Sequence, residues 1–377
     1  MPQSERIKQL NNKAARRGKY VLYWMQAAQR AYYNHALEYA IEKANERSKP
    51  LLVVFGLTED YPQANLRHYW FMLEGLRETQ NTLADKGIKM IVMRKSPDKA
   101  AIEFGKDAEL VIVDGGQLRI QRKWRQEAAR KIGCALFEVE TNLIIPVTET
   151  SGKEEFAART IRPKIHKKLD YYMAGMKHKK VKKDSLGLKF DEFDISDIEK
   201  ATAKLKIDKS VKPVEEFIGG TSNAKKHLSK FIREKLDDYD ELRNDPTLDY
   251  QSNMSAYLHF GQISPLYIAM QAAKSKAKGK DAYLEELIVR RELSHNFVYY
   301  NDKYDKPECI EPWSKRTLNY HNKDKREYIY TLAQFEQAET HDPYWNAAQR
   351  EMMLRGKMHG YMRMYWGKKI LEWTKSW

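Results

Sequence analysis

Short apolar segments alternate with amphipathic helical segments in the N-terminal part of the chain, and this alternation constrains the fold more than any other feature. The predicted strands are rich in β-branched and aromatic residues and cover residues 20–25, 51–55, 89–93, 110–114 and 135–139. Helical segments at 27–47, 66–86, from 97 onward and 119–132 separate them. Apolar strands separated by helices are typical of a buried parallel sheet covered on both faces. The pattern predicts a Rossmann-like α/β domain over residues 18–148, with a parallel five-stranded sheet.

The standard dinucleotide-binding turn is absent from this predicted domain. No Gly-x-Gly-x-x-Gly sequence follows any of the five strands. If the α/β domain binds a ligand, we expect it to use a different arrangement.

The composition changes after residue 148. Residues 149–225 lack the strand–helix alternation, and five of the seven residues from 177 to 183 are lysine. A charge run of this kind is usually a solvated surface, which favours a basic interdomain linker over a dedicated DNA contact. Apolar residues then recur at helical spacing in 226–238, 264–275, 281–300, 325–337 and 344–373, without a strand. We therefore expect an all-α C-terminal domain over residues 226–377.

Charge and cysteine content limit the class of protein. The formal net charge is +15 over 377 residues, which favours polyanionic partners. No apolar run approaches the ~18 residues of a membrane span, and the first residues lack the apolar core of a secretion signal. Two cysteines, Cys134 and Cys309, are too few for a disulfide framework or a cysteine-rich metal site. These features predict a cytoplasmic protein that neither enters a membrane nor binds a metal.

Two segments of the helical domain combine polar residues with helix signals. Gln251-Ser-Asn-Met-Ser255 places hydroxyls at a helix start, which suits either anion binding or an ordinary N-cap before a turn at Gly261. In residues 283–297, the spacing of Glu286 and Arg290 predicts an i,i+4 ion pair. The apolar residues 287–289 and Leu293 cover much of that helix, so it is expected to be largely buried. Its charges then need partners or a ligand.

Tryptophan is concentrated at the C-terminal end. Five of the eight tryptophans lie at 313, 345, 366, 373 and 377. Trp366 and Trp373 are two helical turns apart and share one face of a helix. Trp345 lies on a preceding segment that we expect to fold back beside them. Packing in a helical core accounts for one such pair and less well for the third indole.

These motifs together resemble the class II DNA photolyases. Residues 283–297 resemble the family signature, with Tyr283 in place of phenylalanine. Residues 251–264 resemble its flavin-phosphate turn, with Met254 and Ala256 replacing leucine and proline. The segments 357–366, 368–373, 157–165 and 66–72 are also similar, in the same order, so that the resemblance covers about 20–377.

The resemblance implies an α/β antenna domain joined to a helical domain that binds FAD and DNA. A deazaflavin-type chromophore is the antenna that it suggests. The residues implied at the diphosphate and ribityl side of FAD, or as an arginine beside it, are Tyr239, Arg243, Gln251, Ser252, Asn253, Met254, Ser255 and Arg363. No metal ligand is implied.

The implied activity is that of a deoxyribodipyrimidine photo-lyase, in which blue light drives an electron from reduced FAD into a flipped-out cyclobutane pyrimidine dimer. Glu286 would hydrogen-bond the damaged bases and Met364 would pack against them. Arg290 stands where some relatives have tryptophan, which leaves one wall of the lesion pocket undefined. The implied tryptophan chain, which carries electrons from the surface to oxidised flavin, comprises Trp366, Trp345 and Trp373.

Further expectations and two alternatives complete this interpretation. We expect damaged DNA as the partner, a monomeric protein, and association with the nucleoid when the protein is bound to DNA. One alternative is a cryptochrome-like flavin photoreceptor, which shares the fold but does not repair DNA. The other is a flavin-less DNA-binding fragment.

The C-terminal end carries one more expectation. Class II relatives continue beyond the position of Trp377, and the helix at 357–373 has no Gly or Asn C-cap. We therefore expect a helical domain that is incomplete at its C-terminus, with Arg363 buried and lacking its carboxylate partner. Such a domain would bind FAD weakly.

Overall fold

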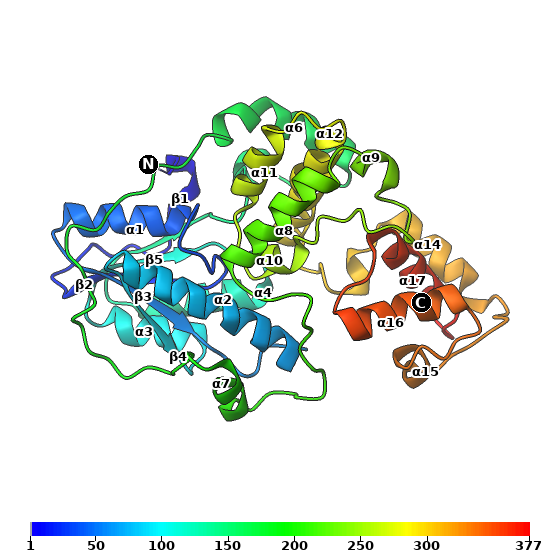
Figure 1. The fold of residues 1–377 in the computed structure, drawn as a ribbon, viewed down its shortest axis with the longest axis horizontal. Helices are drawn as coiled ribbons and strands as arrows, with labels where there is room; N and C mark the ends of the chain where they lie inside the picture. Colours follow the sequence, from blue (N-terminus) through cyan, green and yellow to red (C-terminus); the bar gives the residue numbers. More distant parts are fainter. Residues whose placement is uncertain (1) are drawn as a thin grey trace.

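The computed structural model describes residues 2–377, which form an α/β part and a helical part (Figure 1). The α/β part contains one six-stranded sheet with the order β1-β6-β5-β2-β3-β4. Its strands are β1 (Ile7–Gln9), β2 (Tyr20–Trp24), β3 (Leu51–Gly56), β4 (Lys89–Met93), β5 (Ala108–Asp114) and β6 (Leu136–Val139). Strands β2 to β6 are parallel, so the five predicted strands and the fold class are confirmed.

The sixth strand, β1, is an addition to the predicted sheet. It pairs antiparallel with β6 through Ile7 and Val139. The adjacent Arg6 side chain is buried and donates a hydrogen bond to the carbonyl of Leu143 at 3.0 Å. Since β1 is held by this edge pairing and by Arg6, its three residues need no apolar run of their own.

Every residue of β2 and β3 is buried, because helices cover both faces of the sheet. Helices α1 (His35–Glu46) and α2 (Leu66–Asp85) pack on one face. Helices α3 (Pro97–Gly105) and α4 (Arg119–Lys131) pack on the other. The first helix was predicted from residue 27 but begins at His35. Asn34 is its N-cap residue, and the Asn34 side chain accepts a hydrogen bond from the backbone N–H of Leu37.

Residues 149–225 contribute to the core between the sheet and helices α1 and α2, and to the core of the helical part. Helices α5 (Val147–Thr150) and α6 (Ala158–Tyr172) pack with the helical part, and α7 (Ile198–Lys204) packs on the sheet side of α2. The lysine-rich stretch runs along α1, where the Lys179 amide donates to Glu38 at 2.8 Å and the Lys182 amide donates to Asn45 at 2.8 Å. The domain limits drawn at 148 and 225 remain predictions.

The helical part begins with α8 (Thr221–Glu234), whose first residues precede the predicted start at 226. The elements that follow are α9 (Tyr239–Leu242), α10 (Ser255–His259), α11 (Pro265–Ala273), α12 (Lys280–Leu284), the π-helix η2 (Glu285–Arg290), α13 (Arg291–Tyr300), α14 (Pro312–Tyr320), α15 (Leu332–Glu336), α16 (Pro343–Arg355) and α17 (Gly360–Glu372). Short 3₁₀ turns occur at η1 (Ser4–Arg6), η3 (Pro307–Cys309) and η4 (His321–Lys323). As predicted, residues 226–377 contain no strand, and the structure describes all of them.

Two predicted helices differ from the observed ones. The helix expected at 325–337 is reduced to α15, which starts at the cap residue Thr331. The helix expected at 344–373 is divided into α16 and α17 by Gly356, which adopts a left-handed conformation with φ of +67°. Glycine tolerates this conformation without a Cβ clash and commonly ends a helix.

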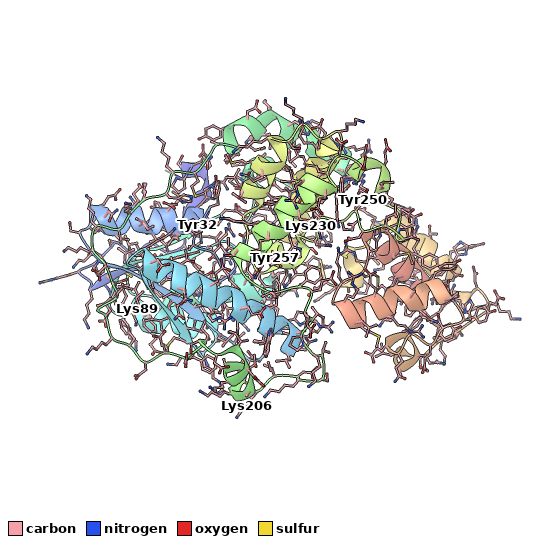
Figure 2. All side chains as sticks on the ribbon, viewed as in Figure 1. Tyr32, Lys89, Lys206, Lys230, Tyr250 and Tyr257 are labelled. Carbon is pink, nitrogen blue, oxygen red and sulfur yellow. The ribbon has the colours of Figure 1, made fainter. Side chains whose placement is uncertain are left out.

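The α/β and helical parts are packed against each other through aromatic rings. Phe71 on α2 lies 5.1 Å from Tyr257 on α10, measured between ring centroids, and Tyr257 is marked at this junction in Figure 2. The buried Arg30 also donates to the carbonyl of Gly261 at 2.9 Å. No helix within residues 2–377 is both long and apolar enough to cross a membrane.

Candidate functional site

The turn at 251–255 is built by contacts from distant parts of the helical domain. Asn253 has a φ of +59°, a conformation in which asparagine is enriched, and its side chain accepts a hydrogen bond from the Lys357 ammonium. The Gln251 amide donates to the carbonyl of Arg243 at 2.7 Å and lies 3.1 Å from Nε2 of His359, the N-cap residue of α17. The turn therefore joins α9 to the start of α17.

An arginine beside this turn connects it to η2. Nη1 of Arg243 lies 2.9 Å from Oε1 of Glu286, and its guanidinium lies over the ring of Tyr239 at 5.5 Å. The Nε atom of Arg243 is buried and has no hydrogen-bond partner within residues 2–377. A buried donor without a partner costs free energy, so this side chain is suited to an additional anionic ligand.

These residues fit a bound diphosphate group. Arg243 and Lys357 bring two cations to the turn at 251–255. Burial lowers the pKa of Lys357 to about 8, which indicates a poorly hydrated ammonium. A phosphate oxygen would replace the hydration that burial has removed. Of the remaining turn residues, Met254 is buried, whereas Ser255 is exposed at the first position of α10.

The charged residues of η2 pair differently from the prediction. Arg290 contacts Glu285 at 3.4 Å, and Glu286 pairs with Arg243 instead. In a π-helix, hydrogen bonds run between residues five apart, which brings position 290 over position 285 rather than 286. Arg162 on α6 completes the arrangement with two hydrogen bonds to Glu285, at 2.7 and 3.1 Å. The expected i,i+4 pair between Glu286 and Arg290 is therefore wrong.

The burial predicted for this segment is observed. The apolar residues Leu287, Ile288 and Val289 are buried, whereas Arg290 is exposed. Glu292 accepts from the backbone amides of Ile144 and Ile145 through Oε1, at 2.7 and 3.2 Å, whereas its Oε2 atom is buried without a hydrogen-bond partner within residues 2–377.

The three tryptophans of the predicted chain form one cluster. The Trp345 and Trp366 rings are stacked at 6.0 Å with 9° between their planes, and Trp345 meets Trp373 edge to face at 6.2 Å. Trp345 Nε1 donates to the carbonyl of Trp366 at 3.1 Å, and Trp366 Nε1 donates to Gln349 at 3.0 Å. Trp345 thus lies between the other two, as expected from a segment that folds back.

Two residues of α17 that the family resemblance assigns to ligands are exposed. Arg363 is exposed, so it does not carry the free-energy cost of a buried unpaired charge, and the expectation of a buried arginine is wrong. Met364 is also exposed, with 59% of its surface accessible. Both side chains are therefore accessible to a large ligand such as a DNA strand.

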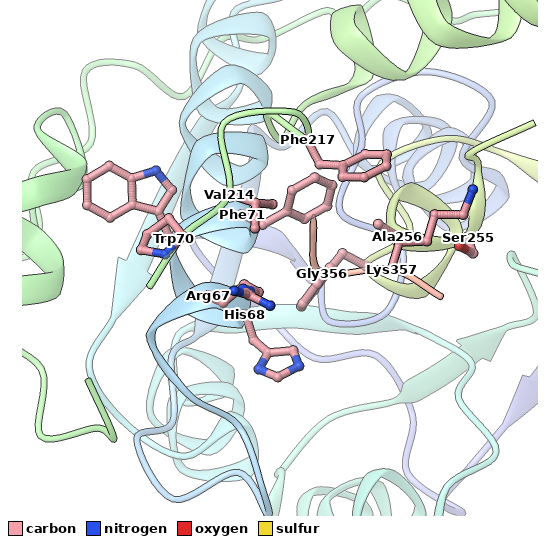
Figure 3. Close-up of a pocket in the computed structure, with 12 residues that line it drawn as sticks. Arg67, His68, Trp70, Phe71, Val214, Phe217, Ser255, Ala256, Gly356 and Lys357 are labelled. Atoms are coloured by element: carbon pink, nitrogen blue, oxygen red, sulfur yellow. The ribbon is translucent and has the colours of Figure 1, made fainter. Parts of the chain in front are cut away.

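A cavity of about 120 Å³ lies between the α/β and helical parts (Figure 3). Its walls combine aromatic rings with basic groups and include Trp70, Phe71, Phe217, Arg67, His68 and Lys357. The cavity borders the turn at 251–255 through Ser255 and Ala256.

Sequence reasoning missed three residues of this region. Lys357 and His359 lie in a segment whose similarity to the family was recognised, but no role was assigned to them. Arg162 lies in another such segment. Their basic side chains inside recognised motifs were the available signal, whereas their partners Asn253, Gln251 and Glu285 are more than 100 positions away in the sequence.

Solved structures that align with this chain include photolyases and a cryptochrome. The structure aligns with a bacterial class III photolyase from Agrobacterium tumefaciens with a TM-score of 0.71 and 16% sequence identity, covering 95% of this chain and 73% of that chain. A cryptochrome from Synechocystis aligns with a TM-score of 0.67 and 14% identity, covering 95% of this chain and 79% of that chain. At these identities the likeness establishes the photolyase/cryptochrome fold.

Sequence comparison identifies the family to which the chain belongs among proteins of this fold. The family model for DNA photolyase matches residues 21–182. A deoxyribodipyrimidine photo-lyase from Methanothermobacter thermautotrophicus is 50% identical over 375 residues, which cover 99% of this chain and 83% of the relative. One from Arabidopsis thaliana is 37% identical, covering 94% and 74%. The chain belongs to the DNA photolyase family.

Proposed function

We propose that this chain is a deoxyribodipyrimidine photo-lyase that uses blue light and reduced FAD to split cyclobutane pyrimidine dimers in DNA. The observation that carries the proposal is the meeting of three elements in the helical part. The turn at 251–255 contacts Arg243, Arg243 pairs with Glu286, and Gln251 reaches the N-cap of the tryptophan-bearing helix α17. Cofactor, lesion and electron route would thus share one region.

The cofactor is proposed to lie against the turn, with Arg243 and Lys357 facing its diphosphate. Gln251, Ser252, Asn253, Met254 and Ser255 supply amide, hydroxyl and backbone groups there, Tyr239 packs beneath Arg243, and Arg363 is the remaining residue assigned to the cofactor. When bound, reduced FAD supplies the light-driven electron that opens the cyclobutane ring. The protein binds it, excludes water and orients the lesion.

The lesion is proposed to contact Glu286, Met364 and Arg290. A dimer inside a duplex must be flipped out, which costs a few kcal/mol and is least costly for a base that already stacks poorly. The Glu286 carboxylate is about two-fifths exposed and accepts from Arg243, so it retains lone pairs for the base edge. Met364 offers an exposed, polarizable thioether as a packing surface.

We further propose that Trp366, Trp345 and Trp373 form the route along which electrons enter the helical part. Their stacked and edge-to-face contacts give continuous indole contact along α16 and α17. Indole is readily oxidised, so a row of three, with Trp345 and Trp373 buried and Trp366 partly buried, is suited to this task.

The class II assignment and the antenna are finer parts of the proposal. The signature at 283–297 supports class II. A deazaflavin-type antenna is proposed to bind the α/β part near the carboxyl ends of β2 and β5. Trp24, Gln26, Trp124 and Arg125 surround a cavity of about 10 Å³ there, so these side chains would have to move to admit the chromophore. This is the point at which the strand order reverses, where open α/β sheets commonly bind ligands. The partner is lesion-containing DNA, and the protein is proposed to act as a monomer.

The main alternative is a cryptochrome-like photoreceptor, because the Synechocystis cryptochrome shares the fold. One experiment separates the possibilities. The purified chain is examined for flavin absorption, reduced chemically and illuminated with DNA containing a thymine dimer. Flavin binding with loss of the dimer supports the photo-lyase. Flavin binding without repair supports a photoreceptor, and a colourless protein that binds DNA supports a flavin-less DNA-binding protein.

A further inference from the structure

Two lysines and three tyrosines meet where the α/β part contacts the helical part, outside the candidate site. The lysines are Lys86, the C-cap residue of α2, and Lys225, on α8. The rings are those of Tyr32 and Tyr33, just before α1, and of Tyr267 on α11. Tyr32 is 38% exposed, so solvent reaches the cluster. None of these residues has a role in the proposed function.

Both ammonium groups lie over the same ring. The Nζ atom of Lys86 is 3.9 Å from the centre of the Tyr32 ring, and the Nζ atom of Lys225 is 4.9 Å from it. Lys225 Nζ also lies 5.2 Å from the centre of the Tyr267 ring. The face of a ring attracts a cation, but two cations that share one ring repel each other. The rings therefore compensate the two charges only in part.

The acid that acts on Lys86 is already occupied by other donors. This acid is Glu38, whose oxygens lie 2.8 Å from Nδ1 of His178 and 2.8 Å from the backbone nitrogen of Lys179. In the described part of the chain, neither Lys86 nor Lys225 forms an ion pair with a carboxylate. Burial lowers the pKa of Lys86, Glu38 opposes this effect, and the charge of Lys225 adds to it. Two neighbouring positive charges thus remain without a carboxylate partner.

The contacts around the lysines hold this arrangement in place. Lys86 Nζ donates to the carbonyl of Ala31 at 2.7 Å. Tyr33 has a φ of +49°, which is rare for a bulky residue, and its ring lies 5.1 Å from that of Tyr267 and 5.5 Å from that of His178. Strained backbone persists only where the surrounding packing requires it, and such residues are concentrated at ligand sites. The two ammonium groups are therefore presented by a packed surface.

We propose that Lys86 and Lys225 bind the phosphate group of a small phosphorylated molecule, beside the exposed edge of Tyr32. A phosphate dianion carries the charge that the two lysines lack, and its oxygens can accept from both ammonium groups at once. Lysine binds phosphate as a point charge, so the site needs no planar pairing of the kind that arginine forms. The site uses no flavin and does not depend on the proposed function.

A phosphate at this position would connect the two parts of the molecule. Lys86 belongs to the α/β part and Lys225 to the helical part, so one bound anion would replace repulsion across their contact by attraction to a shared partner. The unfolded chain does not bring these residues together. Binding should therefore raise the midpoint of thermal unfolding in proportion to occupancy of the site.

The alternative is that the two lysines only pack on Tyr32. Phosphate would then act only as a salt that is excluded from the protein surface, and it would stabilise every variant equally. Lys225→Met removes the ammonium group and keeps an apolar side chain over the rings. Lys86→Met does the same but also removes the hydrogen bond to Ala31. Lys230→Met is the matched control, because Lys230 is an exposed lysine on α8 (Figure 2).

The first test measures binding of inorganic phosphate to the full chain at constant ionic strength, with chloride as the balancing anion. The protein carries lysine labelled with ¹³C at Cε, and the signals of the two lysines are assigned by their loss in the variants. Both signals should shift with saturation in the parent and in Lys230→Met. In Lys225→Met the remaining signal should respond with at least tenfold lower affinity. Shifts that do not saturate, or equal affinity in the parent and in Lys225→Met, overturn the proposal.

The second test compares thermal unfolding in phosphate and in chloride at equal ionic strength. The midpoint should rise in the parent and in Lys230→Met, and the rise should be lost in Lys225→Met and Lys86→Met. Equal rises in all four proteins would show a general salt effect and no site.

A third measurement identifies the source of the phosphate group. Adenosine monophosphate and a single-stranded DNA oligonucleotide are titrated in turn, and the same two lysine signals are followed. Competition between adenosine monophosphate and inorganic phosphate supports a small phosphorylated ligand. A response to the oligonucleotide alone overturns the proposal and assigns this surface to nucleic acid.

Discussion

Nη1 of Arg243 lies 2.9 Å from Oε1 of Glu286, so one ion pair joins the residue assigned to the flavin phosphates to the residue assigned to the lesion. The pair links α9 to the π-helix η2, which are 43 positions apart in the sequence. Cofactor binding and lesion recognition are therefore expected to influence each other through this contact.

Glu286→Gln is expected to lower repair while leaving FAD bound. The amide keeps the shape and one oxygen that can accept from Arg243, but it loses the negative charge that strengthens hydrogen bonds to the damaged bases. A hydrogen bond to a charged group contributes about 1.5–3 kcal/mol, so lesion affinity should fall by roughly tenfold or more. Photorepair yield and flavin absorbance measure the two effects. Glu234→Gln is the control, since Glu234 pairs with Arg233 on the surface, and loss of flavin in Glu286→Gln would contradict the assignment.

Trp366→Phe is expected to block photoreduction of oxidised flavin and to spare repair when the flavin is reduced chemically. Phenylalanine preserves an aromatic ring against Trp345 but is far harder to oxidise. It also removes the hydrogen bond from Trp366 to Gln349, so thermal unfolding should be checked beside the photochemistry. Photoreduction at the parent rate would show that electrons follow another path.

The parts of the fold that sequence could predict are those dictated by local pattern. The strands Tyr20–Trp24 and Leu51–Gly56 are apolar at every position and are buried at every position. The contact between Trp345 and Trp366 followed from helical spacing and one fold-back. In contrast, β1 could not be predicted, because Ile7–Gln9 has only one apolar residue and depends on pairing with β6.

In the candidate site, the observed contacts that the sequence did not predict are those between residues far apart in the chain. Arg162 reaches Glu285 across 123 positions, and Lys357 reaches Asn253 across 104. Neither partner can be inferred from spacing along one helix. The π-helix at Glu285–Arg290 likewise carries no local sequence signal, although it determines which acid Arg290 meets.

Binding to lesion-containing DNA is expected to weaken with salt. For each phosphate that the protein neutralises, the slope of log K against log salt concentration should be about −0.9. Arg290 is exposed, so its guanidinium can neutralise a phosphate of the strand that carries the lesion as well as contact the lesion itself. Arg290→Ala should therefore reduce the magnitude of the slope by about 1 and weaken binding to lesion-containing DNA. Fluorescence anisotropy titrations from low to high salt measure this, and a flat titration of the parent would exclude backbone contacts.

The lysine-rich stretch provides the matched control for charge. It runs along α1, at the opposite end of the molecule from α17 (Figure 1). Replacing Lys177, Lys180, Lys182 and Lys183 by alanine should leave the salt slope almost unchanged. A change in slope equal to that of Arg290→Ala would place DNA on the α1 surface instead.

Glu292, which is buried, and Glu140, which is partly buried, should make the protein less stable as the pH rises above neutrality. Burial raises the pKa of Glu140 to about 8 and that of Glu292 to about 7, whereas an unperturbed glutamate titrates near about 4.3. Between these values the folded protein retains protons that the unfolded chain has released, so the free energy of unfolding falls as pH rises. Below pH ~6.5 the buried His35 and the partly buried His295 act in the opposite direction, because desolvation lowers their pKa values.

From about pH 7 to 8 both histidines are mostly neutral in the folded and the unfolded state, and the acids dominate the slope. Glu140→Gln mimics the protonated acid beside Gln117, which donates to Glu140 at 3.0 Å. In the parent, ionisation of Glu140 should lower the free energy of unfolding by up to about 1.4 kcal/mol per pH unit. This part of the decline should be absent in Glu140→Gln. Urea unfolding at intervals across this range measures the slope, and Glu103→Gln serves as the control because Glu103 pairs with Lys95 on the surface. Parallel profiles for Glu140→Gln and the parent would mean that Glu140 is already ionised in the folded protein at neutral pH.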